Sequence, residues 1–203
     1  MDRRPGARVS PSVNGAGGGA GAGAGVGGGV GAGGSAGGAG GAGGGAGAGV
    51  GAVWLAEAVA LAERNVREGG GPFGALVVAD NRVIGRGTNR VTRDNDPTAH
   101  AEVVAIRAAC QALDDFRLTG ATLYSSCEPC PLCLSAALWA RVDRVEYAAD
   151  RHDAARGGFD DVAFYELFAK DRVDWATPVV GVELPGRTAP FDAWLAKEGR
   201  VEY

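Results

Sequence analysis

One histidine, one glutamate and a cluster of cysteines are the residues whose types and spacing could do chemistry. His100 lies two residues before Glu102, and further along the chain the sequence reads Cys127-Glu128-Pro129-Cys130-Pro131-Leu132-Cys133. One imidazole and two thiolates are good ligands for Zn²⁺, and three protein ligands leave the fourth tetrahedral position open for water. The pattern therefore predicts a catalytic zinc site on His100, Cys130 and Cys133.

Glu102 indicates what such a site would do. Zn²⁺ lowers the pKa of a bound water to near neutral, so that hydroxide can attack a carbon bearing an exocyclic amine. A carboxylate beside the metal can take the proton of that water and later protonate the departing ammonia. An H-x-E motif followed by P-C-x-x-C is the signature of zinc-dependent base deaminases. We therefore expect Glu102 to be the proton shuttle of a hydrolytic deamination.

The remaining cysteines and the second histidine leave alternatives open. Cys127 could complete a closed Cys₃His structural site, or belong to part of an iron–sulfur run, although no other cysteine has a suitable spacing. We expect Cys127 to be a non-ligand at the end of a strand. Cys110 is predicted to be a small buried residue within a helix, and His152 a solvated loop residue. The sequence assigns no role to Glu128.

Composition divides the chain into two regions. Residues 15–51 contain only Gly and Ala with a few Val and one Ser. Neither Gly nor Ala can build a core, and Gly has a high entropy cost of folding. We expect residues 1–51 to be a disordered Gly/Ala-rich tail and residues 52–203 to be one domain. The tail lacks the apolar block of a secretory signal or a membrane span, and the abrupt change in composition suggests Val50 as an alternative initiation site.

The net charge of the second region limits the classes of partner that it can bind. The chain has 20 basic and 24 acidic residues, and three arginines and one aspartate fall in residues 1–51, which leaves 17 basic and 23 acidic residues and a net charge of −6. An acidic domain is a poor host for nucleic-acid phosphates. Three of the four cysteines lie within seven residues, which is typical of metal chemistry rather than of a disulfide framework. We expect a cytoplasmic protein with neither a nucleic-acid nor a membrane partner.

Hydrophobic periodicity predicts helices and strands that alternate after a first hairpin, which favours a mixed sheet with helices on its faces. Helices are expected at residues 53–67, 97–113, 131–141, 161–169 and 190–197, and strands at residues 73–78, 82–88, 121–125, 142–148 and 178–184. His100 would fall in the first turn of one helix, and Cys133 in the first turn of another. Two helix N-termini that face each other would bring the ligands together and favour thiolate.

Further stretches of the domain have the pattern of a known family. They are Gly71-Pro72-Phe73-Gly74-Ala75, Asn89-Arg90-Val91-Thr92, Asn95 through Glu102, Tyr124 through Cys133, Trp139-Ala140-Arg141, Tyr147-Ala148-Ala149, Gly158-Phe159-Asp160-Asp161 and Glu202-Tyr203. With them, residues 71–203 resemble the guanine deaminases of the cytidine-deaminase-like superfamily, in their small bacterial form. The zinc motifs are common to the whole superfamily, whereas the box at residues 158–161 and the terminal tyrosine are more specific.

The resemblance implies an α/β protein with a three-layer α/β/α cytidine-deaminase-like fold and a five-stranded mixed sheet. It implies a homodimer that exchanges its C-terminal segment and one Zn²⁺ per chain on the three predicted ligands. The implied reaction is the hydrolytic deamination of guanine to xanthine and ammonia, with Glu102 as the proton shuttle. The resemblance also suggests which side chains line the purine pocket: Phe73, Asn89, Trp139, Asp161 and Tyr203 of the partner subunit.

Residue types alone leave other interpretations of these pocket residues. Phe73 and Trp139 could be core residues, and Asn89 and Asp161 could cap turns or helices. Two positions depart from the family pattern. Leu132 replaces the usual Met, a swap of similar volume that we expect to be neutral. Leu138 replaces the usual aromatic residue before Trp139, and could reshape one wall of the pocket.

Three functional hypotheses follow from the sequence. The first is guanine deamination. The second is deamination of a related purine, either guanosine or an adenosine in tRNA, and the acidic domain argues against the tRNA substrate. The third is a non-catalytic, zinc-stabilised binding module, which would have no need of a carboxylate at Glu102.

Overall fold

The computed structural model describes residues 48–202, so most of the expected tail and Tyr203 lie outside the described part. Helix α1 spans Ala48–Arg67 and includes the four residues 48–51 that we had assigned to the tail. The helix therefore begins before the boundary expected at residue 51. Gly51 is buried next to Tyr124 and Glu146, and packing of this turn lets a helix extend through residues that would not form one alone.

A four-stranded mixed sheet forms the centre of the described region, in the order β2-β1-β3-β4. Its strands are β1 (Gly74–Ala79), β2 (Arg82–Thr88), β3 (Thr122–Cys127) and β4 (Arg144–Ala149). Strand β1 is antiparallel to β2 and β3, and β3 is parallel to β4. Asp80 and Asn81 have positive φ angles of 49° and 60°, which is the conformation of a tight two-residue hairpin turn. The mixed α/β sheet is thus confirmed.

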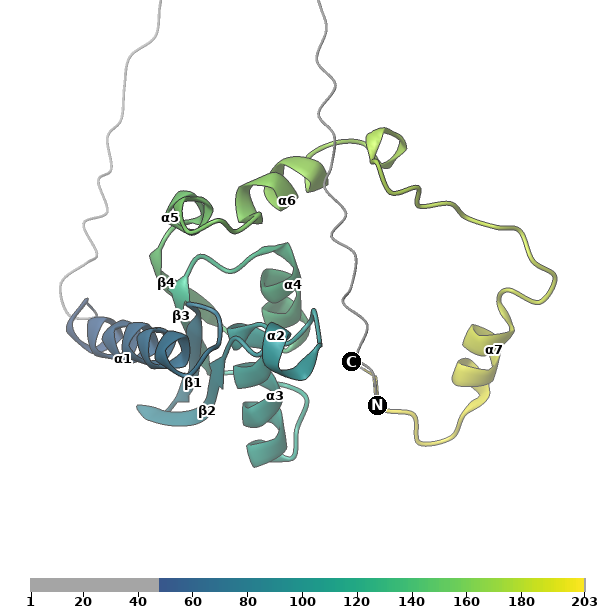
Figure 1. The fold of residues 1–203 in the computed structure, drawn as a ribbon. Coiled ribbons are helices and arrows are strands. Elements are labelled where there is room, and N and C mark those ends of the chain that lie inside the picture. The colour runs from purple at the N-terminus through teal and green to yellow at the C-terminus, as the bar shows by residue number, and fades with distance from the viewer. Residues whose placement is uncertain (1–47, 203) are drawn as a thin grey trace, which may run out of the picture. The chain divides into compact units, whose positions relative to one another are not determined.

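Helices pack on both faces of this sheet (Figure 1). Ala75 and Val77 of β1 face α3 (Ala101–Leu113) and α4 (Pro131–Trp139), whereas Leu76 and Val78 face α1. The two faces follow the period of two that a strand requires. Helix α3 lies so close to β2 that side chains at Gly85 and Gly87 would collide with its backbone. The close approach places the N-terminus of α3, and with it His100, near the end of the sheet.

Shorter helices complete the described chain. They are α2 (Val91–Asp94), α5 (Arg151–Arg156), α6 (Asp161–Phe168), the 3₁₀ helix η1 (Arg172–Asp174) and α7 (Ala189–Ala196). Helices α2 and α5 were not predicted. Helix α5 begins with a capping box in which Asp150 and Asp153 each accept the other's backbone N–H, a local signal that the periodicity did not reveal. None of the helices within residues 48–202 is both long and apolar enough to cross a bilayer.

The predicted fifth strand at residues 178–184 is not formed. Within the described residues the sheet ends at β4, which pairs with β3 alone. Val180 is 75% exposed and Val182 is 79% exposed. A strand needs a neighbour for its backbone hydrogen bonds, and this segment pairs with none. The expectation of five strands was therefore wrong for the described chain.

Candidate active site

The three predicted metal ligands converge at one point. His100 Nδ1 lies 3.5 Å from Cys130 Sγ and 3.4 Å from Cys133 Sγ, and the two sulfur atoms are 3.7 Å apart. A tetrahedral zinc bound at about 2.3 Å by sulfur and about 2.0 Å by nitrogen would separate two sulfurs by about 3.8 Å, and sulfur from nitrogen by about 3.5 Å. The spacing of the ligand atoms therefore fits a zinc ion.

Two helix starts position these ligands. His100 is the N-cap of α3 and Cys130 the N-cap of α4, with Cys133 in the first turn of α4. Neither N-cap side chain bonds to its own helix, because both are turned toward the shared site. The positive ends of two helix dipoles favour negative charge there. The predicted arrangement of facing helix N-termini is confirmed.

Hydrogen bonds among the three ligands make the pKa of each depend on the protonation of the others. Hydrogen bonds from the Cys133 thiol and from His100 lower the pKa of Cys130 to about 4. The Cys130 sulfur in turn raises the pKa of Cys133 and that of His100. All three groups must give up the protons that they share in order to bind a metal. Such a donor set, with two thiolates and an imidazole around one point, suits a divalent zinc ion.

Cys127 does not belong to this group. Its thiol donates a hydrogen bond to the Asp150 carbonyl at 3.4 Å, and burial raises its pKa to about 12. In the part of the chain that the structure describes, His100, Cys130 and Cys133 are the residues whose donor atoms gather closely enough to hold a metal ion. The open three-ligand site is favoured over the closed Cys₃His site.

Glu102 lies beside the ligands in the first turn of α3 and is 4% exposed. The Ser125 hydroxyl on β3 donates to its Oε1 at 3.0 Å, and the Cys133 thiol donates to its Oε2 at 3.3 Å. Burial raises the pKa of the Glu102 carboxyl above its ordinary value. A buried carboxyl beside the metal ligands is placed to both accept and release a proton. Sequence reasoning missed Ser125, because the strand pattern shows which way a side chain points but not its partner.

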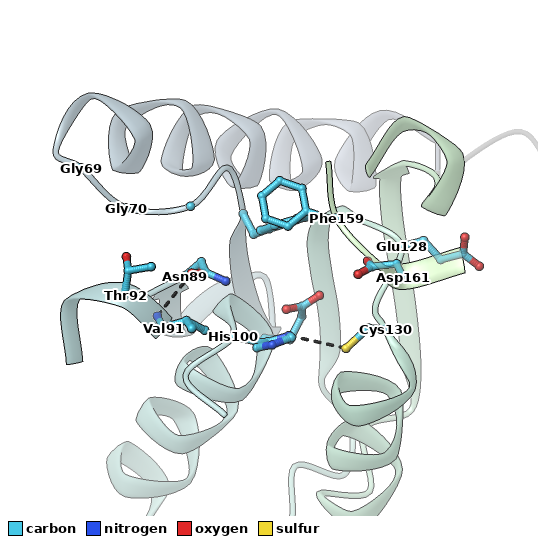
Figure 2. Close-up of a pocket in the computed structure, with 13 residues that line it drawn as sticks. Gly69, Gly70, Asn89, Val91, Thr92, His100, Glu128, Cys130, Phe159 and Asp161 are labelled. Atoms are coloured by element: carbon cyan, nitrogen blue, oxygen red, sulfur yellow. Dashed lines mark hydrogen bonds between the residues drawn. The ribbon is translucent and has the colours of Figure 1, made fainter. Parts of the chain in front are cut away.

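A cavity of about 460 Å³ opens over His100, Cys130 and Glu102 (Figure 2). Three of the predicted pocket residues, Phe73, Asn89 and Asp161, line it. Figure 2 shows Asn89 and Asp161 on opposite sides of the cavity. Phe159 adds a further wall, with its ring edge-on to Phe73 at 4.7 Å between centroids. Phe159 belongs to the box that matched the family pattern, but sequence reasoning gave it no role.

Trp139 is not brought into this cavity. Trp139, at the end of α4, is 61% exposed, and the Arg141 guanidinium lies 5.6 Å from its ring centroid. With Leu138 and Ser135 it lines a separate surface hollow. Leu138 therefore shapes no wall of the main cavity within one chain. Tyr203 lies outside the described residues, and the substrate roles of both aromatic residues stay predictions.

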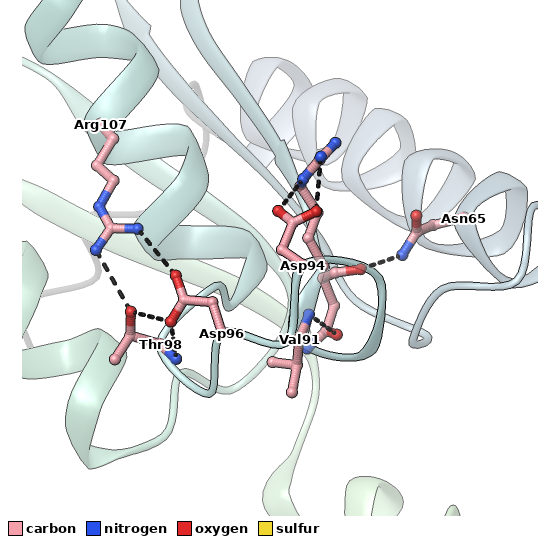
Figure 3. Close-up of polar contacts among 8 residues, drawn as sticks. Asn65, Val91, Asp94, Asp96, Thr98 and Arg107 are labelled. Carbon is pink, nitrogen blue, oxygen red and sulfur yellow. Dashed lines mark hydrogen bonds and ion pairs between the residues drawn. The ribbon is translucent and has the colours of Figure 1, made fainter. Parts of the chain in front are cut away.

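A buried asparagine on α1 holds two walls of the cavity together. Asn65 is 1% exposed, and its Nδ2 donates to the carbonyls of Gly71 and Asn89, each at 2.8 Å (Figure 3). A Cβ at Gly70 would collide with the Asn65 amide, so glycine at this point lets Asn65 keep both hydrogen bonds. In the sequence, Asn65 is marked only as a polar residue within the apolar pattern of a helix, which does not reveal its partners.

Polar contacts also shape the loop that leads to His100 (Figure 3). The Asp96 carboxylate accepts hydrogen bonds from the backbone N–H and the hydroxyl of Thr98 at 2.8 and 2.7 Å. A guanidinium nitrogen of Arg107 forms an ion pair with the other Asp96 oxygen at 3.8 Å. Such local bonds compete with helix formation. Helix α3 therefore begins at Ala101, later than the predicted start.

The comparison with protein families identifies the central part of the chain. Residues 52–149 match the cytidine and deoxycytidylate deaminase zinc-binding region. The matched range contains the three ligands and Glu102. A tRNA-specific adenosine deaminase of Agrobacterium fabrum is 47% identical over 95 residues, which are 47% of this chain and 60% of that protein. The family match therefore covers the zinc-binding part of this chain.

The relatives named guanine deaminase match more of the chain. The guanine deaminase of Bacillus subtilis is 48% identical over 151 residues, 74% of this chain and 97% of its own length. The crystal structure of that protein superimposes on this chain with a TM-score of 0.72. The superposition covers 75% of this chain and 98% of that chain, at 47% sequence identity. A solved guanine deaminase of Nitrosomonas europaea is 32% identical, covers 53% of this chain and 63% of its own, and has a TM-score of 0.51. The chain therefore belongs to the guanine deaminases, within the cytidine and deoxycytidylate deaminase family of zinc-binding enzymes.

Proposed function

We propose that the protein catalyses the hydrolytic deamination of guanine to xanthine and ammonia. The observation that carries this proposal is the position of Glu102, a buried carboxyl of raised pKa next to three convergent metal ligands at the floor of a cavity. The cavity volume of about 460 Å³ lies in the range of small-molecule sites. The 48% identity with the guanine deaminase of Bacillus subtilis over nearly its whole length supports the choice of substrate.

His100, Cys130 and Cys133 would hold the zinc ion, which supplies a Lewis acid that makes water nucleophilic at neutral pH. Glu102 Oε2 faces the ligands while Oε1 is held by Ser125. We assign Glu102 two proton transfers: it accepts the first proton of the water and delivers it to a ring nitrogen, and it then carries the second proton, from the added hydroxyl, to the departing amine. The C2–N bond breaks, the oxygen of water stays on the base, and ammonia leaves.

Side chains around the cavity supply the means to bind and orient the base. The Asn89 amide can offer both a donor and an acceptor, and the Asp161 carboxylate can accept N–H groups at a purine edge. Phe73 and Phe159 offer apolar surface for the ring faces. Burial raises the pKa of Asp161, which means that its charged form is short of stabilising partners. Hydrogen bonds from the N–H groups of a substrate would stabilise that charged form.

We further propose a homodimer that exchanges its C-terminal segment. Within the described residues, Val173 is 88% exposed, Phe191 68% and Leu195 63%. Apolar side chains of this size gain free energy from burial, and a second chain would supply the surface. Trp139 and Tyr203 would complete the pocket in such a dimer. We place the protein in the cytoplasm, because free thiolate ligands require a reducing compartment.

One assay separates guanine from the other substrates. Purified enzyme is incubated with guanine, guanosine, adenosine-containing tRNA and cytosine, and ammonia release is measured. We expect release from guanine above all others. Preference for guanosine or tRNA would move the enzyme to the second hypothesis, and no release from any substrate by a zinc-loaded protein would favour the binding module.

A further inference from the structure

Glu128 borders the cavity but does not face it. Figure 2 shows its carboxylate turned away from His100 and Cys130. The side chain is only 13% exposed, and a carboxylate in such a place needs partners. Arg151, the first residue of α5, supplies them. Its Nε donates to Oε2 at 2.8 Å, its backbone N–H donates to the same oxygen at 3.1 Å, and a terminal guanidinium N–H donates to Oε1. The carboxylate is therefore engaged by Arg151.

Arg151 also contacts helix α6. Its guanidinium carbon lies 3.5 Å from the centroid of the Tyr165 ring, within the range of a cation–π contact. The Tyr165 hydroxyl donates to the Pro129 carbonyl at 2.6 Å. A planar guanidinium can pair with a carboxylate along its edge and stack on a ring with its face. Together these contacts tie α5 and α6 to the loop that ends in the ligand Cys130.

Helix α6 carries Asp161, whose side chain lines the cavity. Asp161 and Tyr165 are one helical turn apart and share a face of the helix. Helix α6 has no buried residue, so the sheet core contributes little to its placement. Just before the helix, the Phe159 ring packs on Phe73. The position of the Asp161 carboxylate therefore depends on a small number of contacts.

We propose that Glu128, Arg151 and Tyr165 form a clamp that holds helix α6 against the ligand loop, and so positions Asp161 for the purine base. All three are positioning residues. The inference rests on the proposed guanine deamination, because affinity for the base is the property that the clamp sets. Loss of the clamp misplaces Asp161 but leaves Glu102 and its partner Ser125 in the core, so it weakens binding of the base more than proton transfer.

Arg151→Met tests the clamp directly, because it removes the guanidinium and keeps the apolar stem. We expect KM for guanine to rise about tenfold to a hundredfold, since a small misplacement of a binding group has effects of this size. The value of kcat should stay within about twofold, and zinc content should be unchanged. Arg156→Met is the matched control. Arg156 lies on the same helix and is 83% exposed in its ion pair with Asp153, so KM should not change.

Milder variants distinguish the clamp from a general loss of stability. Arg151→Lys keeps the charge but cannot form the bidentate pair, so we expect an intermediate KM. Glu128→Gln should raise KM for guanine, as Arg151→Met does. The double variant should be no worse than the poorer single variant, because both substitutions remove the same pair. Additive effects would contradict the clamp.

Amide hydrogen exchange tests the clamp without reference to the reaction. We expect residues 161–168 to exchange faster in Arg151→Met than in Arg156→Met, while α3 is unaffected. A change in only one of the two quantities, KM or α6 exchange, would overturn the proposal. So would loss of zinc, or a fall in kcat alone, because either result places the effect at the metal ligands. If the wild-type enzyme does not deaminate guanine, the proposed function fails, and the exchange comparison still decides whether Arg151 holds α6.

Discussion

The cavity has two walls that are built in different ways. The metal wall is formed by His100, Glu102 and Cys130 together with Cys133 and Ser125 buried directly behind them, and these residues lie at the starts of α3 and α4 and on β3. The base wall consists of Phe73, Asn89, Phe159 and Asp161, which lie outside the strands, on the loops and at the start of α6. Glu102 and Cys133 are 4% and 0% exposed, whereas α6 has no buried residue.

The difference between the walls separates chemistry from recognition. The metal wall is packed into the core that the sheet and its helices form, so its geometry is supported by many contacts. The base wall is held by individual contacts, such as those of Asn65 and of the clamp. Substitutions in the metal wall should therefore lower kcat or remove zinc. Substitutions in the base wall should change KM first.

The largest effect is expected from the zinc ligands. Cys130→Ser or Cys133→Ser removes a thiolate from a three-residue donor set, and we expect loss of most of the zinc and of the activity. Zinc per chain can be measured by plasma mass spectrometry after dialysis. Cys127→Ser is the matched control and should retain zinc, because its thiol bonds to the Asp150 carbonyl. An empty site in Cys127→Ser would restore the closed Cys₃His interpretation.

The next effect concerns proton transfer at the metal wall. Glu102→Gln keeps the shape of the side chain and removes its proton shuttle. General acid–base catalysis is worth ~10²–10⁴-fold, so we expect kcat to fall at least that far while zinc stays bound. Single-turnover ammonia release measures the step. Near-normal release would show that another group moves the proton.

Deletion of residues 199–203 tests the proposed dimer at the base wall. We expect zinc and fold to survive, and kcat/KM for guanine to fall by well over tenfold, equivalent to more than ~1.4 kcal/mol of transition-state stabilisation. Co-refolding this truncation with the Glu102→Gln chain provides the control. A mixed dimer would pair an intact Glu102 site with the other chain's intact C-terminus. If the mixture recovers no activity, exchange of the segment is excluded.

The smallest effect distinguishes positioning within the metal wall from base binding. Ser125→Ala removes the hydrogen bond to Glu102 Oε1. One hydrogen bond to a carboxylate is worth about 1.5 kcal/mol at the lower end of its range, so we expect kcat to fall roughly tenfold. KM for guanine and zinc content should stay at the wild-type values. A rise in KM with unchanged kcat would place Ser125 in the base wall and contradict the division.

The zinc ligands could be predicted from the sequence because the signal is local. The side-chain types of His100, Cys130 and Cys133 specify the metal, and Pro131 indicates the helix start that positions two of them. The hairpin at Asp80 and Asn81 was equally local. The predicted helices and strands of residues 53–149 agree with the structure to within a few residues, because their amphipathic periods match the core that they build.

Long-range contacts explain what could not be predicted. Ser125 meets Glu102 across 23 positions of sequence, Asn65 meets Asn89 across 24, and Tyr165 meets Pro129 across 36. No residue type or spacing within either segment indicates such a pair. The predicted strand at residues 178–184 shows the converse case, because its residues suit a strand but no neighbour pairs with it.

The sequence by itself predicted the candidate ligand set, the candidate acid–base residue and the alternation of helices and strands, since each depends on residue types and short spacings. Only the tertiary structure decided that Cys127 stands apart from the ligands, that Ser125 holds Glu102, and that Glu128 pairs with Arg151 rather than facing the cavity. The physical reason is that burial and partner distance set the protonation and orientation of a side chain. Both quantities arise only when segments far apart in the chain pack together.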